Sequence, residues 1–345
     1  MKEKGLLSMS EKYYEFASLS AFPELENQAN LLIEEVFAYS KKNSFKTDFA
    51  PLTSQRNLSQ RFVLIDSSRM EVVAHIGTRM RNFIWKAETI PVCMIGGVAV
   101  KKELQGRGIF KSLMERIVAT LESQCALFLL WTDKHEMYEK WGFYLAGKQW
   151  CYRTNTPAPL RGQKTLYSKL NQEEQKMIQS LYKNEINGRY FSPLRDEDDW
   201  QDIADITSSD LYLFDHGYYF KNKGMDLQDV VHECVSTLSI NDLLKVIGDK
   251  SQLWHPLNQP VDDHVQQDLQ LVGLWRLNKH TMALKKISML LGAKVETQDW
   301  DFCVKHDGRN YSLKAHELLE EIFGYGNFNI KKDSVPVYIS GLDSI

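Results

Sequence analysis

The stretch GGVAVKKELQGRGIFKSLMERI, residues 96–117, decides the fold of the first part of the chain. It begins as an apolar strand, passes through a turn that contains Gly106 and Gly108, and continues as an amphipathic helix. Such a turn gathers backbone N–H groups at the positive end of a helix dipole, and this arrangement binds phosphate. The stretch therefore predicts a strand, a phosphate-binding turn and a helix, in that order.

The helix after this turn has one apolar face and a basic beginning. Its apolar residues recur with helical spacing, at Ile109, Phe110, Leu113, Met114, Ile117, Val118 and Leu121. Four cations precede or open the helix, at Lys101, Lys102, Arg107 and Lys111. Residues four apart can face the same way, so Arg107 and Lys111 are placed to meet one phosphate group.

A second strand-to-helix unit follows in LFLLWTDKHEMYEKWGF, residues 127–143. An apolar strand leads into a short helix over 134–141, and Gly142 ends that helix. Tyr138 lies on the helix, four residues before Gly142. Together the two units predict an enzyme that handles a phosphorylated acyl carrier.

The composition limits the classes of protein to which the chain can belong. Its 345 residues correspond to two or three domains of usual size. A net charge of −3 argues against nucleic-acid binding through overall charge, and no apolar stretch approaches the ~20 residues that span a bilayer. The beginning MKEKGLLSMSEKYYEF lacks the apolar core of a signal peptide. The scattered cysteines show no metal-ligand spacing and no disulfide framework, which favours the reducing cytoplasm; they are Cys93, Cys125, Cys151, Cys234 and Cys303.

The rest of the first part predicts helices and strands around the two units. Residues 25–39 have the spacing of an amphipathic helix, and RFVLID and EVVAHIGTRM indicate two successive strands. The continuous apolar run VCMIGGVAV is typical of a strand buried on both faces. The glycine pair Gly96 and Gly97 in that run predicts a bulge. RTNTPAPLRGQK, residues 153–164, has two prolines and no periodicity, which predicts a domain linker.

The part beyond the linker alternates helices and strands. Helices are expected near 171–184 and 198–207, and strands in LYLFDHGYYF and DVVHECVSTL. INDLLKVIG then predicts a helix, and QLWHPL and LQLVGLWRL predict one strand each. The chain is expected to finish with a helix in MALKKISMLLG, a hairpin that turns at Asp307 and Gly308, a helix in KAHELLEEIFG and a terminal strand in VPVYISGLDSI.

At its two strand-to-helix units the sequence resembles the GNAT superfamily of acyl-CoA-dependent N-acetyltransferases. That family has Q/R-x-x-G-x-G/A after one strand and Tyr-x-x-x-Gly-Phe after the next. Gln105, Gly108 and the run Tyr138-Glu139-Lys140-Trp141-Gly142-Phe143 match these signatures. Phe110 departs from them, because it stands where Gly or Ala is usual. Its side chain is expected to point into the apolar stripe of the helix, away from the pyrophosphate. The resemblance covers residues 25–150.

The resemblance implies a fold and a set of cofactor contacts. The implied fold class is α/β (α+β), a GNAT fold whose mixed twisted sheet is flanked by helices. The implied co-substrate is acetyl-CoA, with no metal. The turn would hold its pyrophosphate, and the strand before the turn would pair with the pantetheine arm and polarise the thioester carbonyl through a backbone N–H. The implied cofactor-binding residues are Val98, Ala99, Val100, Gln105, Gly106, Arg107, Gly108, Ile109, Phe110 and Lys111.

The resemblance also implies a proton donor. Acetyl transfer needs a neutral amine to attack the thioester and an acid to protonate the departing thiolate. Tyr138 has the family position of that general acid, and a phenol with a pKa of roughly 10 is protonated at neutral pH. No motif identifies the general base: His75, Glu88 and His135 all belong to the first part, and none is distinguished from the others.

The second half resembles a degenerate GNAT repeat that lacks the phosphate-binding turn, as in the intracellular-survival acetyltransferases and the N-myristoyltransferases. The resemblance implies a catalytic domain at 1–152, a linker at 153–164, and a degenerate GNAT-like domain at 165–345 with an appended hairpin–helix element, a small C-terminal α+β extension. In both groups the C-terminal carboxylate serves as the base, which here implies the carboxylate of Ile345.

The expected function is transfer of an acetyl group from acetyl-CoA to a primary amine, by direct attack in a ternary complex. The acceptor, a small-molecule or peptide amine, is expected against residues 25–60 and the second half. No nucleic acid and no membrane are expected as partners. Two alternatives stay open: the chain binds acyl-CoA as a sensor or scaffold without turnover, or it transfers a longer acyl group.

Overall fold

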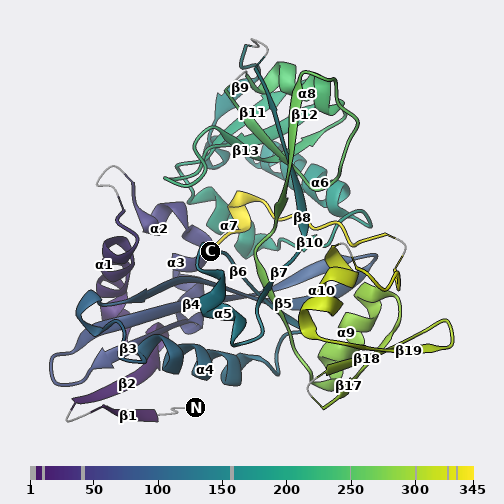
Figure 1. The fold of residues 1–345 in the computed structure, drawn as a ribbon. Coiled ribbons are helices and arrows are strands. Elements are labelled where there is room, and N and C mark those ends of the chain that lie inside the picture. Colours follow the sequence, from purple (N-terminus) through teal and green to yellow (C-terminus); the bar gives the residue numbers. More distant parts are fainter. Residues whose placement is uncertain are drawn as a thin grey trace.

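The computed structural model describes residues 5–9, 12–39, 43–155, 159–248, 250–299, 301–324, 326–331 and 333–345. Two large mixed sheets, each with helices packed on it, and a small antiparallel sheet make up this part of the chain (Figure 1). The end of the chain lies where the two large sheets approach each other.

The first large sheet has the strand order β1-β2-β3-β4-β5-β6-β16-β7, and the short β10 adds to β4. Neighbouring strands run antiparallel from β1 to β5, whereas β5 and β6 run parallel. The strands are β1 (Gly5–Met9), β2 (Lys12–Ser18), β3 (Arg61–Asp66), β4 (Glu71–Trp85), β5 (Glu88–Val100), β6 (Leu127–Leu130), β7 (Tyr144–Leu145), β10 (Ser192–Pro193) and β16 (Leu274–Leu277).

Strand β5 is buried on both faces, as its continuous apolar run predicts. Val92 and Met94 pack into the core that contains α1 (Glu26–Val36), while Cys93 and Ile95 pack into the core that contains α4 (Ile109–Leu121). Because side chains alternate along a strand, one run of apolar residues serves both cores. The helices of this part are α1 (Glu26–Val36), α2 (Phe45–Asp48), α3 (Ala50–Thr53), α4 (Ile109–Leu121) and α5 (His135–Glu139).

The second large sheet has the order β15-β8-β14-β13-β12-β11-β9. Like the first, it is an antiparallel series interrupted by one parallel pair, here β13 with β14. This repeated pattern agrees with the expected echo of the first half. Its elements are β8 (Lys148–Thr154), β9 (Gln163–Thr165), α6 (Gln172–Ile186), α7 (Glu197–Ala204), β11 (Asp210–Phe214), β12 (Gly217–Lys221), β13 (Val230–Ser236), α8 (Ile240–Ile247), β14 (Gln252–His255) and β15 (Val265–Leu271).

Each large sheet receives a strand from the other half of the chain. β8 starts at Lys148 and lies between β14 and β15 of the second sheet, and β16 lies between β6 and β7 of the first. The expectation that LQLVGLWRL forms one strand is therefore wrong. The chain leaves the second sheet at Leu271 and enters the first at Leu274, and Gly273 between them has φ +86°. A Cβ there would lie 2.7 Å from the Leu130 carbonyl oxygen, so only glycine fits this crossing without strain.

The stretch expected as a linker, 153–164, also carries strand residues. β8 continues to Thr154, and β9 begins at Gln163, where it pairs with β11. Residues 156–158 of this stretch lie outside the described residues.

The last part of the chain packs against the first sheet. Its elements are α9 (Thr281–Leu291), β17 (Lys294–Gln298), β18 (Asp301–His306), β19 (Arg309–Leu313) and α10 (Ala315–Phe323). Leu319 and Phe323 of α10 share a core with Trp275 of β16 and Leu129 of β6. The hairpin expected at Asp307 and Gly308 is confirmed as β18–β19.

The expected terminal strand is wrong, because the end of the chain runs between the two large sheets. Val337 makes a single bridge with Phe191, and residues Gly341–Asp343 form a 3-10 turn, η6. Among the described helices, none has both the length and the apolar character that crossing a bilayer requires.

Candidate active site

The parallel strands β5 and β6 separate at the glycine pair. Their pairing runs from Val92 with Leu127 to Ile95 with Leu130, and β5 continues beyond it to Val100. Opposite Ile76 of β4, β5 has two residues, Gly97 and Val98, so the predicted bulge is confirmed. Gly97 has φ +56°, a left-handed conformation that favours glycine.

A cavity of about 950 Å³ opens at this separation. Most of the residues predicted for the site line it, namely Val98, Val100, Gln105, Gly106, Gly108, Ile109, Phe110, Lys111, Tyr138 and Ile345. Two predicted residues lie elsewhere. Ala99 points into the opposite core that contains α1, and the side chain of Arg107 is exposed at the tip of the turn. Segments that are distant in sequence therefore meet at one place.

The glycine turn leaves room for an anion at the beginning of α4. Gly106 and Gly108 have φ values of +74° and +80°, and a Cβ at either position would meet no atom within 4 Å. Gln105 donates from Nε2 to the Val100 carbonyl, at 3.1 Å, and so ties the turn to β5. Open space above two glycines at a helix N-terminus fits a pyrophosphate that accepts hydrogen bonds from the backbone.

Phe110 packs against the helix that carries Tyr138. Its ring meets Tyr138 edge-on at 5.4 Å and Trp141 edge-on at 5.2 Å, measured between ring centroids. Phe110 contributes to the core on the α4 side, as expected, and it also lines the cavity. The large side chain that departs from the family signature therefore supports Tyr138.

Tyr138 is held as a neutral phenol. Its side chain is only 7% exposed, and burial raises its pKa to about 12. Edge-on contacts with Phe110, Trp141 and Phe143 fix the ring. A phenol with this pKa stays protonated at neutral pH and can donate its proton in the cavity.

The three alternatives for the general base do not line the cavity. His75 is fully buried, and its Nδ1 donates to the Gly97 carbonyl at 2.7 Å while its Nε2 accepts from Arg61 at 3.1 Å. Burial and the neighbouring Arg61 charge lower its pKa to about 3, so His75 is neutral and supports the bulge. Glu88 lies at the start of β5, 3.5 Å from Lys286, and His135 is the first residue of α5.

Ile345, in contrast, lies directly against the separated strand. A Cβ added at Gly96 would overlap the backbone carbonyl carbon and oxygen of Ile345. The residue is 7% exposed and lines the same cavity as Tyr138. The backbone at the last residue of the sequence therefore reaches the point where β5 and β6 part.

A buried ionic cluster holds the segment that ends at Ile345. Arg195 donates from Nε and Nη2 to the two carboxylate oxygens of Asp343, at 3.0 and 2.8 Å, and from Nη1 to Glu233 at 3.2 Å. All three side chains have no exposed surface. Burial raises the pKa of Asp343, but Arg195, Arg81 and Lys223 together outweigh that effect and hold the pKa below its ordinary value. Arg81 of β4 also lies 3.5 Å from Asp343, so this carboxylate is anchored between the halves.

Comparisons with known proteins identify the first part. The family model "Acetyltransferase (GNAT) domain" matches residues 20–146. This part of the chain is therefore similar to GNAT acetyltransferase domains. The match indicates an acyltransferase enzyme, and it agrees with the resemblance carried by the glycine turn and the Tyr138 element. No curated protein matches the sequence significantly.

Solved structures resemble nearly the whole chain and so support the fold. The GCN5-related N-acetyltransferase from Kribbella flavida is 14% identical with a TM-score of 0.57, over 87% of this chain and 83% of that protein. Eis1 from Mycobacterium abscessus is 13% identical with a TM-score of 0.59, over 91% and 90%. A probable N-acyltransferase from Enterococcus faecalis is 13% identical with a TM-score of 0.58, over 88% and 86%. At such identities the likeness concerns the fold.

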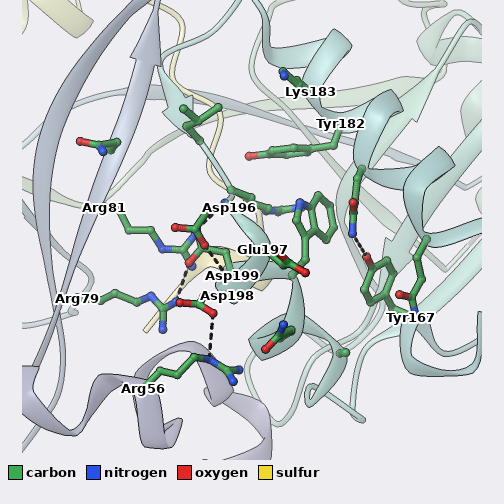
Figure 2. Close-up of a pocket in the computed structure, with 18 of the residues that line it drawn as sticks. Arg56, Arg79, Arg81, Tyr167, Tyr182, Lys183, Asp196, Glu197, Asp198 and Asp199 are labelled. Atoms are coloured by element: carbon green, nitrogen blue, oxygen red, sulfur yellow. Dashed lines mark hydrogen bonds and ion pairs between the residues drawn. The ribbon is translucent and has the colours of Figure 1, made fainter. Parts of the chain in front are cut away.

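A second cavity, of about 1070 Å³, lies where the GNAT domain meets α6 and α7 (Figure 2). Several of its charged groups pair with each other: Arg79 and Arg81 lie 2.6 and 2.9 Å from Asp199, and Arg56 lies 3.9 Å from Asp198. Because cations of the GNAT domain meet anions of α7, this cluster joins the two halves. Among the described residues, no group of three or more His, Cys, Asp or Glu side chains could hold a metal ion.

Sequence reasoning did not identify Arg195, Glu233 and Asp343. They are isolated charged residues on separate segments, and periodicity does not distinguish a buried ion pair from an exposed one. The one signal for this cluster in the sequence is that two titratable residues, His232 and Glu233, are neighbours on one expected strand. It indicates only that the two side chains point to opposite faces of that strand.

Replacing Gly108 by alanine is expected to weaken CoA binding about tenfold or more, which corresponds to about 1.4 kcal/mol. A side chain is strained at φ +80°, and the added methyl group would occupy the space above the turn. Calorimetric titration of CoA measures the change. Gly292→Ala is the matched control, because Gly292 has φ +79°, also meets no atom, and caps α9 away from the cavity. Equal affinity in both variants would contradict the phosphate cradle.

Proposed function

We propose that the protein transfers an acetyl group from acetyl-CoA to a primary amine, by direct attack in a ternary complex. One observation carries the proposal: a single cavity is lined by the glycine turn, the separated end of β5, Tyr138 and Ile345. The GNAT match of residues 20–146 supports the reaction class.

The cofactor side of the cavity comprises the turn and β5. Backbone N–H groups around Gly106 and Gly108 would hold the pyrophosphate, with Lys111 as a nearby cation. Residues 98–100 of β5 would pair with the pantetheine arm, because β6 ends at Leu130 and leaves this part of β5 without its parallel neighbour. A backbone N–H of this strand would polarise the thioester carbonyl.

The acceptor side comprises α1, α2 and the second half, where the sequence predicts it. Phe37, Tyr39 and Phe49 line the cavity from the first half, and Asp226 and Trp254 line it from the second. Aromatic faces and a carboxylate suit a cationic amine. The acceptor class is therefore a small-molecule or peptide amine.

The proposed chemistry divides proton transfer between two groups. As the amine nitrogen bonds to the thioester carbonyl carbon, the Ile345 carboxylate takes a proton from the amine. As the carbon–sulfur bond breaks, Tyr138 donates its phenolic proton to the leaving sulfur. Both groups line the cavity.

The free cysteines support a reducing compartment, the cytoplasm; they are Cys93, Cys125, Cys151, Cys234 and Cys303.

Calorimetric binding of acetyl-CoA and CoA, followed by thiol release in the presence of a panel of amines, tests the proposal. Binding with amine-dependent thiol release supports an acetyltransferase. Binding without release from any amine would instead favour the sensor or scaffold alternative. Parallel measurements with succinyl-CoA and a long-chain acyl-CoA distinguish acetyl transfer from transfer of a longer group.

Tyr138→Phe is expected to lower kcat about 10²-fold while leaving the affinity for acetyl-CoA unchanged, because it removes a general acid but keeps the ring. The pKa of about 12 keeps Tyr138 protonated, so this residue should impose no fall in activity between pH 6 and about 10. Steady-state kinetics measures both effects. Tyr144→Phe, on β7, is the control. An unchanged kcat in Tyr138→Phe would show that another group protonates the sulfur.

A further inference from the structure

We propose that Lys223 is a positioning residue that holds residues 341–345 so that Ile345 faces the separated end of β5. The effect on catalysis rests on the proposed function, whereas the effect on the segment itself does not. Lys223 lies two residues beyond the end of β12 and is 3% exposed. It lines the same cavity as Gly96, Tyr138 and Ile345.

The ammonium group of Lys223 contacts the terminal segment at three atoms. Nζ lies 2.6 Å from the Gly341 carbonyl oxygen, 2.7 Å from Ser344 Oγ and 3.4 Å from the Ser344 carbonyl oxygen. An ammonium has three N–H donors, and each contact is to an oxygen that can accept one. Ser344 Oγ also donates to the Gly341 carbonyl, at 2.8 Å. The lysine and the serine thus close the last turn of the chain.

These hydrogen bonds of Lys223, here called the Lys223 clamp, hold a different residue from the ion pair between Arg195 and Asp343. Arg195 holds the Asp343 side chain, two residues before Ile345. Lys223 contacts the backbone and side chain of Ser344, the residue directly before Ile345. Arg195 therefore fixes the segment through the Asp343 side chain. Lys223 determines the direction of the backbone from Ser344 to Ile345.

Burial of Lys223 disfavours its charged form, whereas the neighbouring carboxylates favour it. Burial lowers its pKa to about 7, while the carboxylates of Asp48, Asp226 and Asp343 act in the opposite direction. Nζ also lies 4.2 Å from the centre of the Phe49 ring, and His232 of β13 is a further titratable neighbour. A proton on Nζ is needed for all three contacts, so the clamp should weaken as the pH rises through about 7.

Lys223 is better suited to hold the segment than to act as the base. A base needs a free lone pair, whereas Nζ donates its hydrogen bonds to the oxygen atoms of Gly341 and Ser344. The charged form is thus the one that these contacts stabilise. Its influence on the reaction would pass through Ile345.

The test uses the full chain and three variants. Lys223→Met removes the charge and keeps an apolar stem, and Lys223→Arg keeps the charge. Lys221→Met is the matched control: Lys221 is also buried, but its partners are Ser251 and Asp229. Hydrogen exchange of the amides in 338–345 reports the segment, and kinetics with acetyl-CoA and an amine reports the reaction.

In Lys223→Met, exchange of these amides is expected to rise about tenfold or more, because the segment opens locally. The kcat is expected to fall about tenfold or more, with the KM for acetyl-CoA changed less than about twofold. Lys223→Arg should restore both quantities at least in part, and Lys221→Met should change neither. In the wild type, protection corrected for intrinsic exchange should fall above pH 7, and in Lys223→Arg it should not.

Two results would overturn the proposal. One is unchanged exchange of 338–345 in Lys223→Met. The other is faster exchange with an unchanged kcat, which would make Lys223 structural only. If the wild type releases no thiol with any amine, the proposed function fails, and the exchange measurement alone then decides whether Lys223 holds the segment.

Discussion

Gly96→Ala is expected to lower the rate of acetyl transfer by about 10²- to 10⁴-fold, the usual contribution of a positioned acid or base. A Cβ at Gly96 would overlap the Ile345 carbonyl group, so the alanine must push the end of the chain away from the cavity. Gly96 does not have a left-handed φ, so the backbone itself accepts alanine. The loss would therefore report the displaced terminus. Single-turnover kinetics at saturating acetyl-CoA measures it.

The control for this prediction is a glycine on the neighbouring strand, β4. Gly77 pairs with Gly96, and the three atoms nearest to a Cβ there all belong to the flexible side chain of Leu52. Gly77→Ala should keep most of the activity. A chain shortened to end at Ser344 should lose as much activity as Gly96→Ala. Wild-type turnover in either the shortened chain or Gly96→Ala would exclude Ile345 as the base.

Arg195→Met is expected to lower the free energy of unfolding by about 3–5 kcal/mol, the usual effect of breaking a buried ion pair by removing one partner. The substitution leaves Asp343 and Glu233 buried without their common cation. It also removes a guanidinium that lies 3.8 Å from the Tyr182 ring and 4.7 Å from the Trp200 ring. Urea denaturation without ligand measures the change.

The stabilisation by Arg195 should depend on pH in one direction. Arg195 holds the pKa of Asp343 below its ordinary value, so the stabilisation is present at neutral pH. It is lost as the pH falls through the pKa of Asp343 in the folded protein. Arg189→Met is the control, because Arg189 follows α6, is half-exposed and pairs with Glu185; an ion pair with an exposed partner contributes about 0–1 kcal/mol. Equal losses in both variants would show that the buried cluster contributes no more than a surface pair.

Local patterns predicted the parts of the site that belong to a single stretch of chain. The strand, glycine turn and helix of residues 96–117 form as expected, because apolar periodicity and glycine conformation are properties of neighbouring residues. The bulge at Gly97 follows for the same reason. Tyr138 was placed correctly on a short helix between β6 and Gly142.

The path of the chain between the sheets could not be predicted in this way. LQLVGLWRL has a continuous apolar pattern, yet Leu271 ends a strand of one sheet and Leu274 begins a strand of the other. Both sheets accept apolar strands, so hydrophobicity does not choose between them. The close approach of Gly273 to the Leu130 carbonyl, which makes the crossing possible, exists only in the folded protein.

The sequence by itself determined the strand, glycine turn and helix of residues 96–117 and the short helix that carries Tyr138, since each depends on residues close together in the chain. The tertiary structure decided that Ile345 reaches Gly96, that Arg195 and Lys223 hold the segment before it, and that His75 supports a bulge instead of facing the cavity. These contacts join residues far apart in sequence. Their energies come from burial and charge pairing, which arise only when distant segments of the chain pack together.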